Sequence, residues 1–214
     1  MIATPNWKLL KILLSYFLYD RMNVENTRKF ATELLRYGMR PNQLIDICGN
    51  NKPLTENQIY NLSCKLKKED LPFERYTRSA VSTSTMQRAI LSHFVAEYLN
   101  RATVTEAVDL PVLFVAWKAT IGWVISHQID SNPKLWHPKY INLGTFYEMA
   151  TIASGIKASG YDKNVKRNSV HFAIERCPHC NCLYVGINTV QNISAVDCCF
   201  CQLFEAKMQE KFTN

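Results

Sequence analysis

Cys177-Pro178-His179-Cys180 begins the stretch that decides the C-terminal fold, and Cys198-Cys199-Phe200-Cys201 ends it after 17 intervening residues. Two residues between paired cysteines let a tight turn aim both sulfurs at one ion. A spacer of this length has room for a β-hairpin that brings the second pair round. Asn181 tolerates the left-handed backbone that such a turn needs. The pattern predicts a closed structural site for one zinc ion, with four ligands: Cys177, Cys180, Cys198 and Cys201.

The same cysteines could instead form disulfides or a redox-active pair. The apolar stretch 9–19 is short, is interrupted by Lys11 and lacks a cleavage site, so we expect no signal peptide and a cytoplasmic location, where disulfides are rare. Nothing βαβ-like surrounds the first pair, which disfavours a thiol redox protein. Three further candidate ligands are interpreted as bystanders: Cys182, Cys199 and His179.

Composition limits the classes of function. The chain has 214 residues, a formal net charge of +7 and a pI of about 9.0, which favours a polyanionic partner such as nucleic acid. No run of about 18 apolar residues is present, so no membrane span is expected. Glycine-rich phosphate loops and the common hydrolase motifs are absent, so the sequence gives no indication of an enzyme.

Hydrophobic periodicity predicts helices before the cysteines, at 7–19, 27–37, 41–48, 56–68, 86–99, 110–125 and 146–156. Thr27 and Thr55 are expected N-caps, and Gly38 is the expected stop of the first capped helix. The segment 110–125 is apolar nearly all round and is expected to be the central buried helix. The polar segment 205–214 is expected to be a frayed tail.

The period changes to two at 170–174 and 183–187, which indicates strands. The predicted fold class is therefore mainly α: a helical domain containing a helix-turn-helix-like unit, with a small C-terminal four-cysteine zinc-ribbon-like β unit. The expected divisions are an N-terminal helical extension at 1–24, the helix-turn-helix-like unit at 25–70, a helical core and subunit interface at 71–160, the zinc-binding unit at 161–204 and the tail at 205–214.

The helices at 27–37, 41–48 and 56–68 are typical of a helix-turn-helix unit, whose third helix enters the major groove. Asparagine can bind adenine and lysine can bind guanine or phosphate. A basic segment before the first cysteine pair could also contact phosphates. Ordinary core helices and a solvated loop remain the alternatives. The candidate DNA-binding residues are Arg40, Lys52, Thr55, Asn57, Asn61, Lys65, Lys163, Lys166, Arg167 and Arg176.

Several stretches occur together in the order found in one family. They are Leu34-Leu35-Arg36-Tyr37-Gly38-Met39-Arg40, Leu54-Thr55 followed by Ile59-Tyr60, Leu71-Pro72-Phe73, and the four cysteines. On these residues the chain resembles, over about 25–204, the C subunit of the flagellar master transcription activator (FlhC). It also resembles the related SetC and AcaC activators of conjugative elements. It departs from the pattern at 50–53, which lengthens a turn, and at Met39, where the family usually has alanine.

The resemblance implies a DNA-binding transcriptional activator subunit that holds one zinc ion. Such a subunit works with a smaller helical, FlhD-like D subunit, in an assembly of four D and two C subunits in the flagellar case. The complex binds promoter DNA and recruits RNA polymerase, at flagellar or conjugative-transfer promoters. The alternative is a zinc-ribbon interaction adaptor without DNA contact, which the apolar helices at 7–19 and 110–125 would suit.

Overall fold

A computed structural model describes residues 6–18, 23–48, 54–68, 85–103, 107–127, 142–158, 172–187 and 198–212. These residues form eight helices and one antiparallel hairpin that carries the first cysteine pair, which confirms the mainly helical fold class. The chain divides into two compact units: unit 1 comprises residues 1–76 and 142–145, and unit 2 comprises 77–141 and 146–214. The elements are α1 (Trp7–Leu18), α2 (Val24–Arg36), α3 (Pro41–Cys48), α4 (Glu56–Lys68), α5 (Thr85–Arg101), α6 (Leu110–Ser126), α7 (Leu143–Ala158), β1 (Phe172–Arg176), β2 (Leu183–Ile187) and α8 (Cys199–Phe212).

Helix α2 begins one turn earlier than the sequence pattern predicted. The side chain of Asn23 accepts a hydrogen bond from the backbone N–H of Asn26 (2.8 Å) and is the N-cap. Thr27 is buried inside the helix, and its hydroxyl donates to the carbonyl of Asn23 (3.0 Å). The prediction of Thr27 as the cap was wrong because a threonine can satisfy its hydroxyl on the preceding turn and so remain helical.

The turn between α2 and α3 is closed by Gly38, as predicted. Gly38 has a φ of +87°, and its N–H donates to the carbonyl of Leu35 (2.9 Å). The N–H of Met39 donates to the carbonyl of Leu34 (3.0 Å), which completes a Schellman motif with both of these side chains buried. Pro41 then begins α3, since its fixed φ suits the first helical position.

Within unit 1, residues 142–145 form hydrogen bonds to the α2–α3 turn. The amide of Gln43 accepts from the N–H of Arg40 (3.0 Å) and donates to the carbonyl of Gly144 (2.9 Å). The N–H of Leu143 donates to the carbonyl of Tyr37 (2.9 Å). The turn is thus fixed by contacts from a segment about a hundred residues away in sequence.

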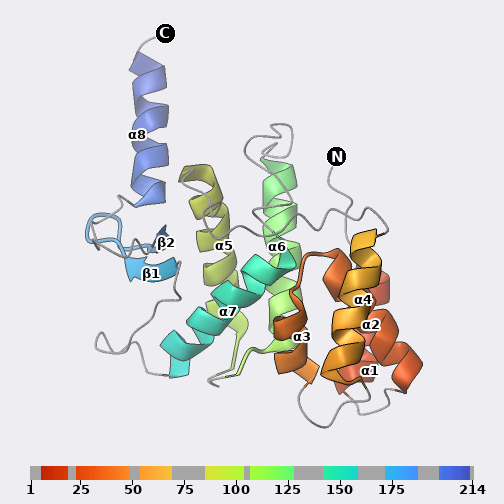
Figure 1. Cartoon of the computed structure of the whole chain (residues 1–214). Helices are drawn as coiled ribbons and strands as arrows, with labels where there is room; N and C mark the ends of the chain where they lie inside the picture. Colours follow the sequence, from red (N-terminus) through yellow and green to blue (C-terminus); the bar gives the residue numbers. More distant parts are fainter. Residues whose placement is uncertain are drawn as a thin grey trace. The chain divides into compact units, whose positions relative to one another are not determined.

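Helix α4 has the predicted bounds and the predicted cap. Thr55 and Gln58 form a capping box, in which the N–H of Thr55 donates to Oε1 of Gln58 (2.9 Å) and the N–H of Gln58 donates to Oγ1 of Thr55 (3.4 Å). Helices α2, α3 and α4 contact one another, and α1 packs on α2 (Figure 1). Unit 1 therefore contains three mutually contacting helices, and their interpretation as a helix-turn-helix-like unit stays a prediction.

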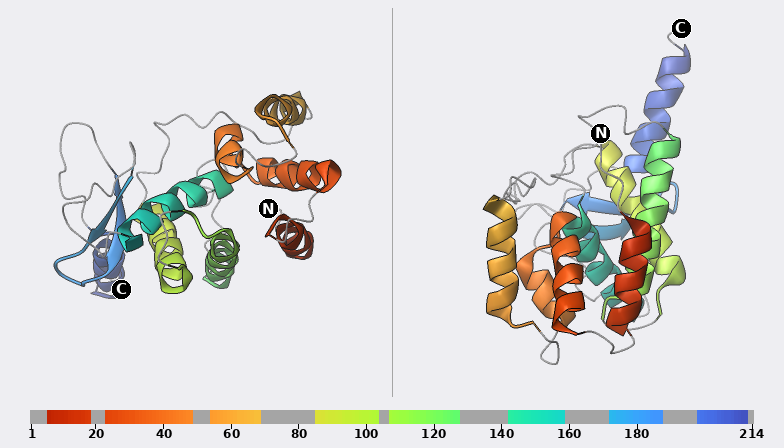
Figure 2. Two further views of the ribbon diagram at one scale, coloured as in Figure 1. Left: turned by 90° about the horizontal axis from the view of Figure 1, so that it is seen from below. Right: turned by 90° about the vertical axis from the view of Figure 1, so that its right-hand side faces the viewer.

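Helix α5 is the central helix of unit 2, between α6 on one side and the hairpin with α8 on the other (Figure 2). Its Phe94 ring lies 4.7 Å from that of Phe146 on α7, and its Tyr98 hydroxyl is 2.8 Å from that of Ser154. The expectation that 110–125 would be central was wrong: Val115 and Ile125 of α6 are 50% and 47% exposed. Apolar composition does not report how many neighbours a helix has. None of the described helices, α6 included, has both the length and the hydropathy to cross a membrane.

The two strands pair with Phe172 opposite Ile187 and Arg176 opposite Leu183, so the first cysteine pair lies in the hairpin turn. The strands predicted at 170–174 and 183–187 are confirmed, so the hairpin is formed around the first cysteine pair and uses only one strand from the spacer among the described residues. The prediction of a frayed tail was wrong, since residues 205–212 continue α8. Starting a helix is the costly step, so a helix that has begun at the second cysteine pair can extend through polar residues at a low cost per residue.

We expect Gly38→Ala to destabilise unit 1. A left-handed conformation costs an L-residue about 1–2 kcal/mol, and the new Cβ would lie 2.6 Å from Cβ of Asn142, which must shift. The urea midpoint of the full chain should fall. Gly122→Ala is the matched control: Gly122 is exposed on α6 and a Cβ there meets nothing within 4 Å, so the substitution should raise stability by up to ~1 kcal/mol. Equal effects of the two substitutions would contradict the role assigned to Gly38.

Candidate metal centre

Four cysteine sulfurs converge at one point of unit 2. The Sγ atoms of Cys177, Cys180, Cys198 and Cys201 all lie within 4.8 Å of one another. The Cys177–Cys201 and Cys180–Cys198 sulfur pairs are both 3.7 Å apart. A tetrahedron of thiolates around zinc, with Zn–S bonds of about 2.3 Å, has an edge of about 3.8 Å. The spacing far exceeds the roughly 2.05 Å of a disulfide, so the cluster fits a metal ion such as zinc.

The first pair sits in a tight turn between β1 and β2. The N–H of Cys177 donates to the carbonyl of Cys182 (2.9 Å), and the N–H of Asn181 donates back to the carbonyl of Cys177 (3.0 Å). Asn181 has a φ of +61°, which confirms the predicted left-handed residue. Arg176 adds a hydrogen bond to the carbonyl of Asn181 (2.9 Å). These bonds fix both sulfurs of the pair on one side of the turn.

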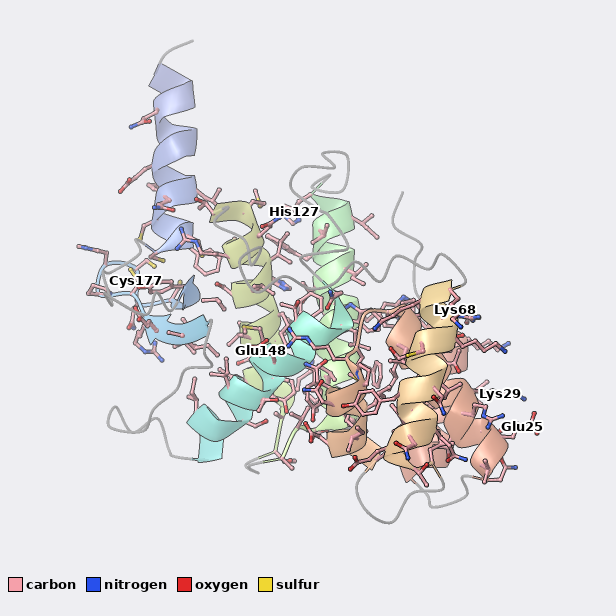
Figure 3. All side chains as sticks on the ribbon, viewed as in Figure 1. Glu25, Lys29, Lys68, His127, Glu148 and Cys177 are labelled. Carbon is pink, nitrogen blue, oxygen red and sulfur yellow. The ribbon has the colours of Figure 1, made fainter. Side chains whose placement is uncertain are left out.

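The second pair lies at the start of α8. Cys198 directly precedes the helix and its carbonyl accepts from the N–H of Gln202 (3.0 Å), while Cys201 is in the first turn. Figure 3 shows Cys177 beside this helix start. The N-terminus of a helix favours negative charge, so this position suits thiolates.

The two pairs differ in electrostatics. Backbone N–H groups lower the pKa of Cys177, and the N–H of Cys182 is the main reason that the pKa of Cys180 falls to about 7. Desolvation, together with the neighbouring thiols, raises the pKa of Cys198 to about 11 and that of Cys201 to about 12. Four thiolates this close repel one another, so a cation is what allows all four to be deprotonated together.

The three spare candidates lie outside the four-sulfur group, as the bystander interpretation requires among the described residues. Cys182 and His179 are exposed on the turn, where the N–H of His179 points at the sulfur of Cys177 (3.4 Å). Cys199 is buried, and its sulfur is 3.6 Å from Oγ of Ser92 on α5. Burial raises its pKa, against the effects of that hydrogen bond and of the Arg88 charge.

The four-cysteine centre packs against α5, a contact that the sequence analysis did not predict. Ser92 of α5 is buried and accepts from the N–H of Val185 on β2 (2.8 Å), while its own hydroxyl donates to the carbonyl of Arg88 (2.6 Å). Ala89 packs in one buried cluster with three of the cysteines and with Tyr184. Across the hairpin, the Tyr184 hydroxyl donates to Glu175 (2.8 Å). No local pattern in α5 could indicate contacts with residues about a hundred positions later.

The predicted DNA-binding residues divide into three groups. Thr55, Asn57, Asn61 and Lys65 are all exposed on or just before α4. Arg40 is half-buried at the α2–α3 turn, and Arg176 is exposed but bonded to Asn181. The others lie outside the described residues: Lys52, Lys163, Lys166 and Arg167. Their contact with DNA stays a prediction.

The exposed face of α4 extends beyond the residues that were singled out. Asn57, Asn61, Cys64 and Lys68 recur at spacings of four, three and four on the side opposite the buried Ile59, Ser63 and Leu66. Tyr60, which is 48% exposed, borders this stripe. Helical periodicity applied to polar rather than apolar residues would have found these additional members.

Comparison with protein-family models, with curated proteins and with solved structures found no match to this chain.

We expect Cys177→Ala to abolish metal binding and to destabilise unit 2, because structural zinc contributes roughly 10–16 kcal/mol of apparent binding free energy that is also folding free energy. Cys182→Ala, a removal of an exposed thiol five residues away, should keep the metal. Mass spectrometry of the purified proteins should find about one zinc per chain in the wild type and in Cys182→Ala, and none in Cys177→Ala. Zinc retained at full stoichiometry in Cys177→Ala would contradict the ligand set.

Proposed function

We propose that this chain is a cytoplasmic DNA-binding transcriptional activator subunit that is braced by a zinc ion and works with a small helical partner. The observation that carries the proposal is the exposed face of α4, where two asparagines one turn apart are followed by lysines. Asn57 and Asn61 offer the amide groups that read adenine, and Lys65 and Lys68 offer charge to guanine or phosphate. The sequence features shared with the FlhC family support the same proposal.

The packing of unit 1 supports α4 as the reading helix. α4 contacts both α2 and α3 through the side that carries Ile59, Ser63 and Leu66, and its polar side is exposed. Its first turn is fixed by the Thr55–Gln58 capping box, and its last turn carries Lys65, Lys67 and Lys68. Figure 3 labels Lys68 at this end of the helix. A rigid helix with a polar face is what direct readout of the major groove requires. The net charge of +7 adds a favourable, salt-dependent contribution.

The other parts of the proposal have narrower support. The four-sulfur geometry supports zinc as the ion, since zinc favours closed tetrahedral thiolate sites. The need for a D-type partner and the recruitment of RNA polymerase to flagellar or conjugative-transfer promoters follow from the resemblance alone. In this scheme zinc supplies no chemistry to a substrate; it holds the hairpin and α8 together.

Asn61→Ala is expected to cost about 1–3 kcal/mol of specific binding, because one bidentate base contact is lost. Lys65→Ala should weaken binding to all sequences and reduce the slope of log K against log salt by about 0.9. The measurement is fluorescence anisotropy with promoter fragments taken from around the chain's gene, at several salt concentrations, after co-purification with a candidate small helical partner encoded beside that gene. Lys118→Ala, at an exposed position of α6, is the matched control and should leave both the specific affinity and the salt slope unchanged.

Binding that never exceeds nonspecific affinity, with the partner present, would overturn the proposal. It would favour the zinc-braced interaction adaptor, for which the half-exposed Val115 and Ile125 of α6 would be the first residues to substitute. Specific binding that is unaffected by Asn57→Ala and Asn61→Ala would instead place the reading surface outside α4.

A further inference from the structure

Two histidines contact one tryptophan where α5 packs against α6. The ring of His93 on α5 stacks on that of Trp123 on α6, with the ring centroids 4.8 Å apart and an interplanar angle of 17°. The ring of His127, which directly follows α6, lies 5.0 Å from the same indole at an angle of 38° (Figure 3). His93 is half-buried and His127 is exposed. Histidine is the side chain whose charge ordinarily changes near neutral pH, so this helix contact contains two groups that can titrate.

Hydrogen bonds assign the proton of the neutral His93 ring to Nδ1. This nitrogen lies 3.3 Å from Oγ1 of Thr120, a fully buried residue of α6. The Thr120 hydroxyl already donates to the carbonyl of Ala116 (2.9 Å), so its oxygen can accept a hydrogen bond from His93 but cannot donate one to it. An added proton therefore goes to Nε2 of His93. Within the described part of the chain, Nε2 has no hydrogen-bond acceptor that would receive the new N–H.

The ring of His127 is held in the same tautomer. Its Nδ1 lies 2.8 Å from the backbone carbonyl of Trp123, and since a carbonyl only accepts, Nδ1 is the donor. The hydroxyl of Ser126 donates to the same carbonyl (2.9 Å). Protonation of either histidine thus adds a positive charge and a new N–H at Nε2, on rings that contact one indole.

The surroundings of His93 disfavour its protonated form. Burial is the largest cause and lowers the pKa of His93 below its ordinary value of 6.5; Glu97, one turn later on α5, opposes this effect, and the charge of His127 adds to it. These are the charged groups that act on His93 within the described residues, and none comes from β2, α7 or α8, the other elements that contact α5. The carboxylate of Glu97 is also paired with Arg101.

We infer that the contact of His93 and His127 with Trp123 is an acid-sensitive joint: the neutral rings hold α5 against α6, and protonation at Nε2 loosens this contact. The joint is separate from the four-cysteine centre, because the neighbouring Ser92 contacts β2 while His93 contacts α6. The inference concerns unit 2 alone and does not depend on the proposed DNA binding.

The sign of the pH effect follows from the two states of His93. Its pKa is lower in the folded chain than in the unfolded chain, so between these two values the unfolded chain binds more protons. Folding is therefore favoured fully above pH 6.5, and the contribution of His93 to stability is lost as the pH falls from there towards the lowered pKa.

Four variants of the full chain separate the charge of the joint from its packing. His93→Phe keeps a planar ring beside Trp123 but cannot be protonated. His93→Asn cannot be protonated either, and its amide can still donate to Thr120. His127→Asn removes the second charge, and His179→Asn, on the exposed turn of the hairpin, is the matched control. Zinc is kept in excess and its content is measured at each pH, so that acid release of the metal is detected separately.

We expect the urea midpoint of the wild type to fall between pH 7.5 and pH 5.5, and tryptophan emission to move to longer wavelength as Trp123 becomes more exposed to water. Both changes should be smaller in His93→Phe and His93→Asn, and His179→Asn should match the wild type. A histidine NMR titration should give His93 a pKa below 6.5, which His127→Asn raises by removing a repelling charge. A purely structural role for His93 would lower the midpoint equally at both pH values.

A pKa of His93 at or above 6.5 in the wild type would overturn the inference, because it would mean that attraction between the imidazolium and the indole outweighs burial. An acid-induced fall in the midpoint that is as large in both His93 variants as in the wild type would also overturn it. If His93→Phe does not fold, His93→Asn and the titration of the wild type decide the question.

Discussion

The fold of unit 2 depends on four sulfur atoms that two separate chain segments hold within 4.8 Å of one another. A two-stranded hairpin of five residues a strand is marginally stable by itself in water. The side chains of α8 that the structure describes beyond Leu203 are all exposed, and that of Phe204 is 65% exposed. Joining the hairpin turn to the helix start through one ion removes much of the freedom of both segments, so the cluster organises elements that are weak alone.

The cluster in turn depends on α5. Ser92 satisfies a backbone N–H of β2 and touches Cys199, while Arg88 reaches α8 through Gln202. These side chains are one turn apart on a single helix face, and Ala89 between them is small enough to let the cysteines approach. The hairpin is therefore not an independent ribbon attached to a helical body. Hydrogen bonds and burial make it part of the core of unit 2, with α5 shared between the metal centre and α6.

Features set by nearby residues were predictable from the sequence, and features set by distant ones were not. The ligand cysteines, the Gly38 stop, the Thr55 cap and Asn181 each follow from a few adjacent residues, because turn and cap chemistry is local. The seat of the centre on Ser92 and the hold of 142–145 on the Gly38 turn arise from tertiary packing, which composition does not encode. Tertiary packing also explains why α5, and not α6, is the central helix of unit 2. α5 carries the polar residues Gln87, Arg88 and Ser92 in buried positions, so its sequence looks less apolar than that of a central helix.

The sequence analysis gave the C-terminal region two predicted functions, zinc binding and contact with DNA phosphates, and electrostatics makes them hard to combine at one site. A metal-loaded tetrathiolate is negative, so it repels phosphate and cannot itself attract DNA. The basic residue nearest the first pair, Arg176, uses its guanidinium to hold the carbonyl of Asn181, which ties it to the turn. Among the described contacts, the exposed asparagines and lysines of α4 form no comparable hydrogen bond to the surrounding protein. On these grounds the proposal assigns DNA reading to α4, and it assigns to the four-cysteine cluster the joining of the hairpin turn to the start of α8.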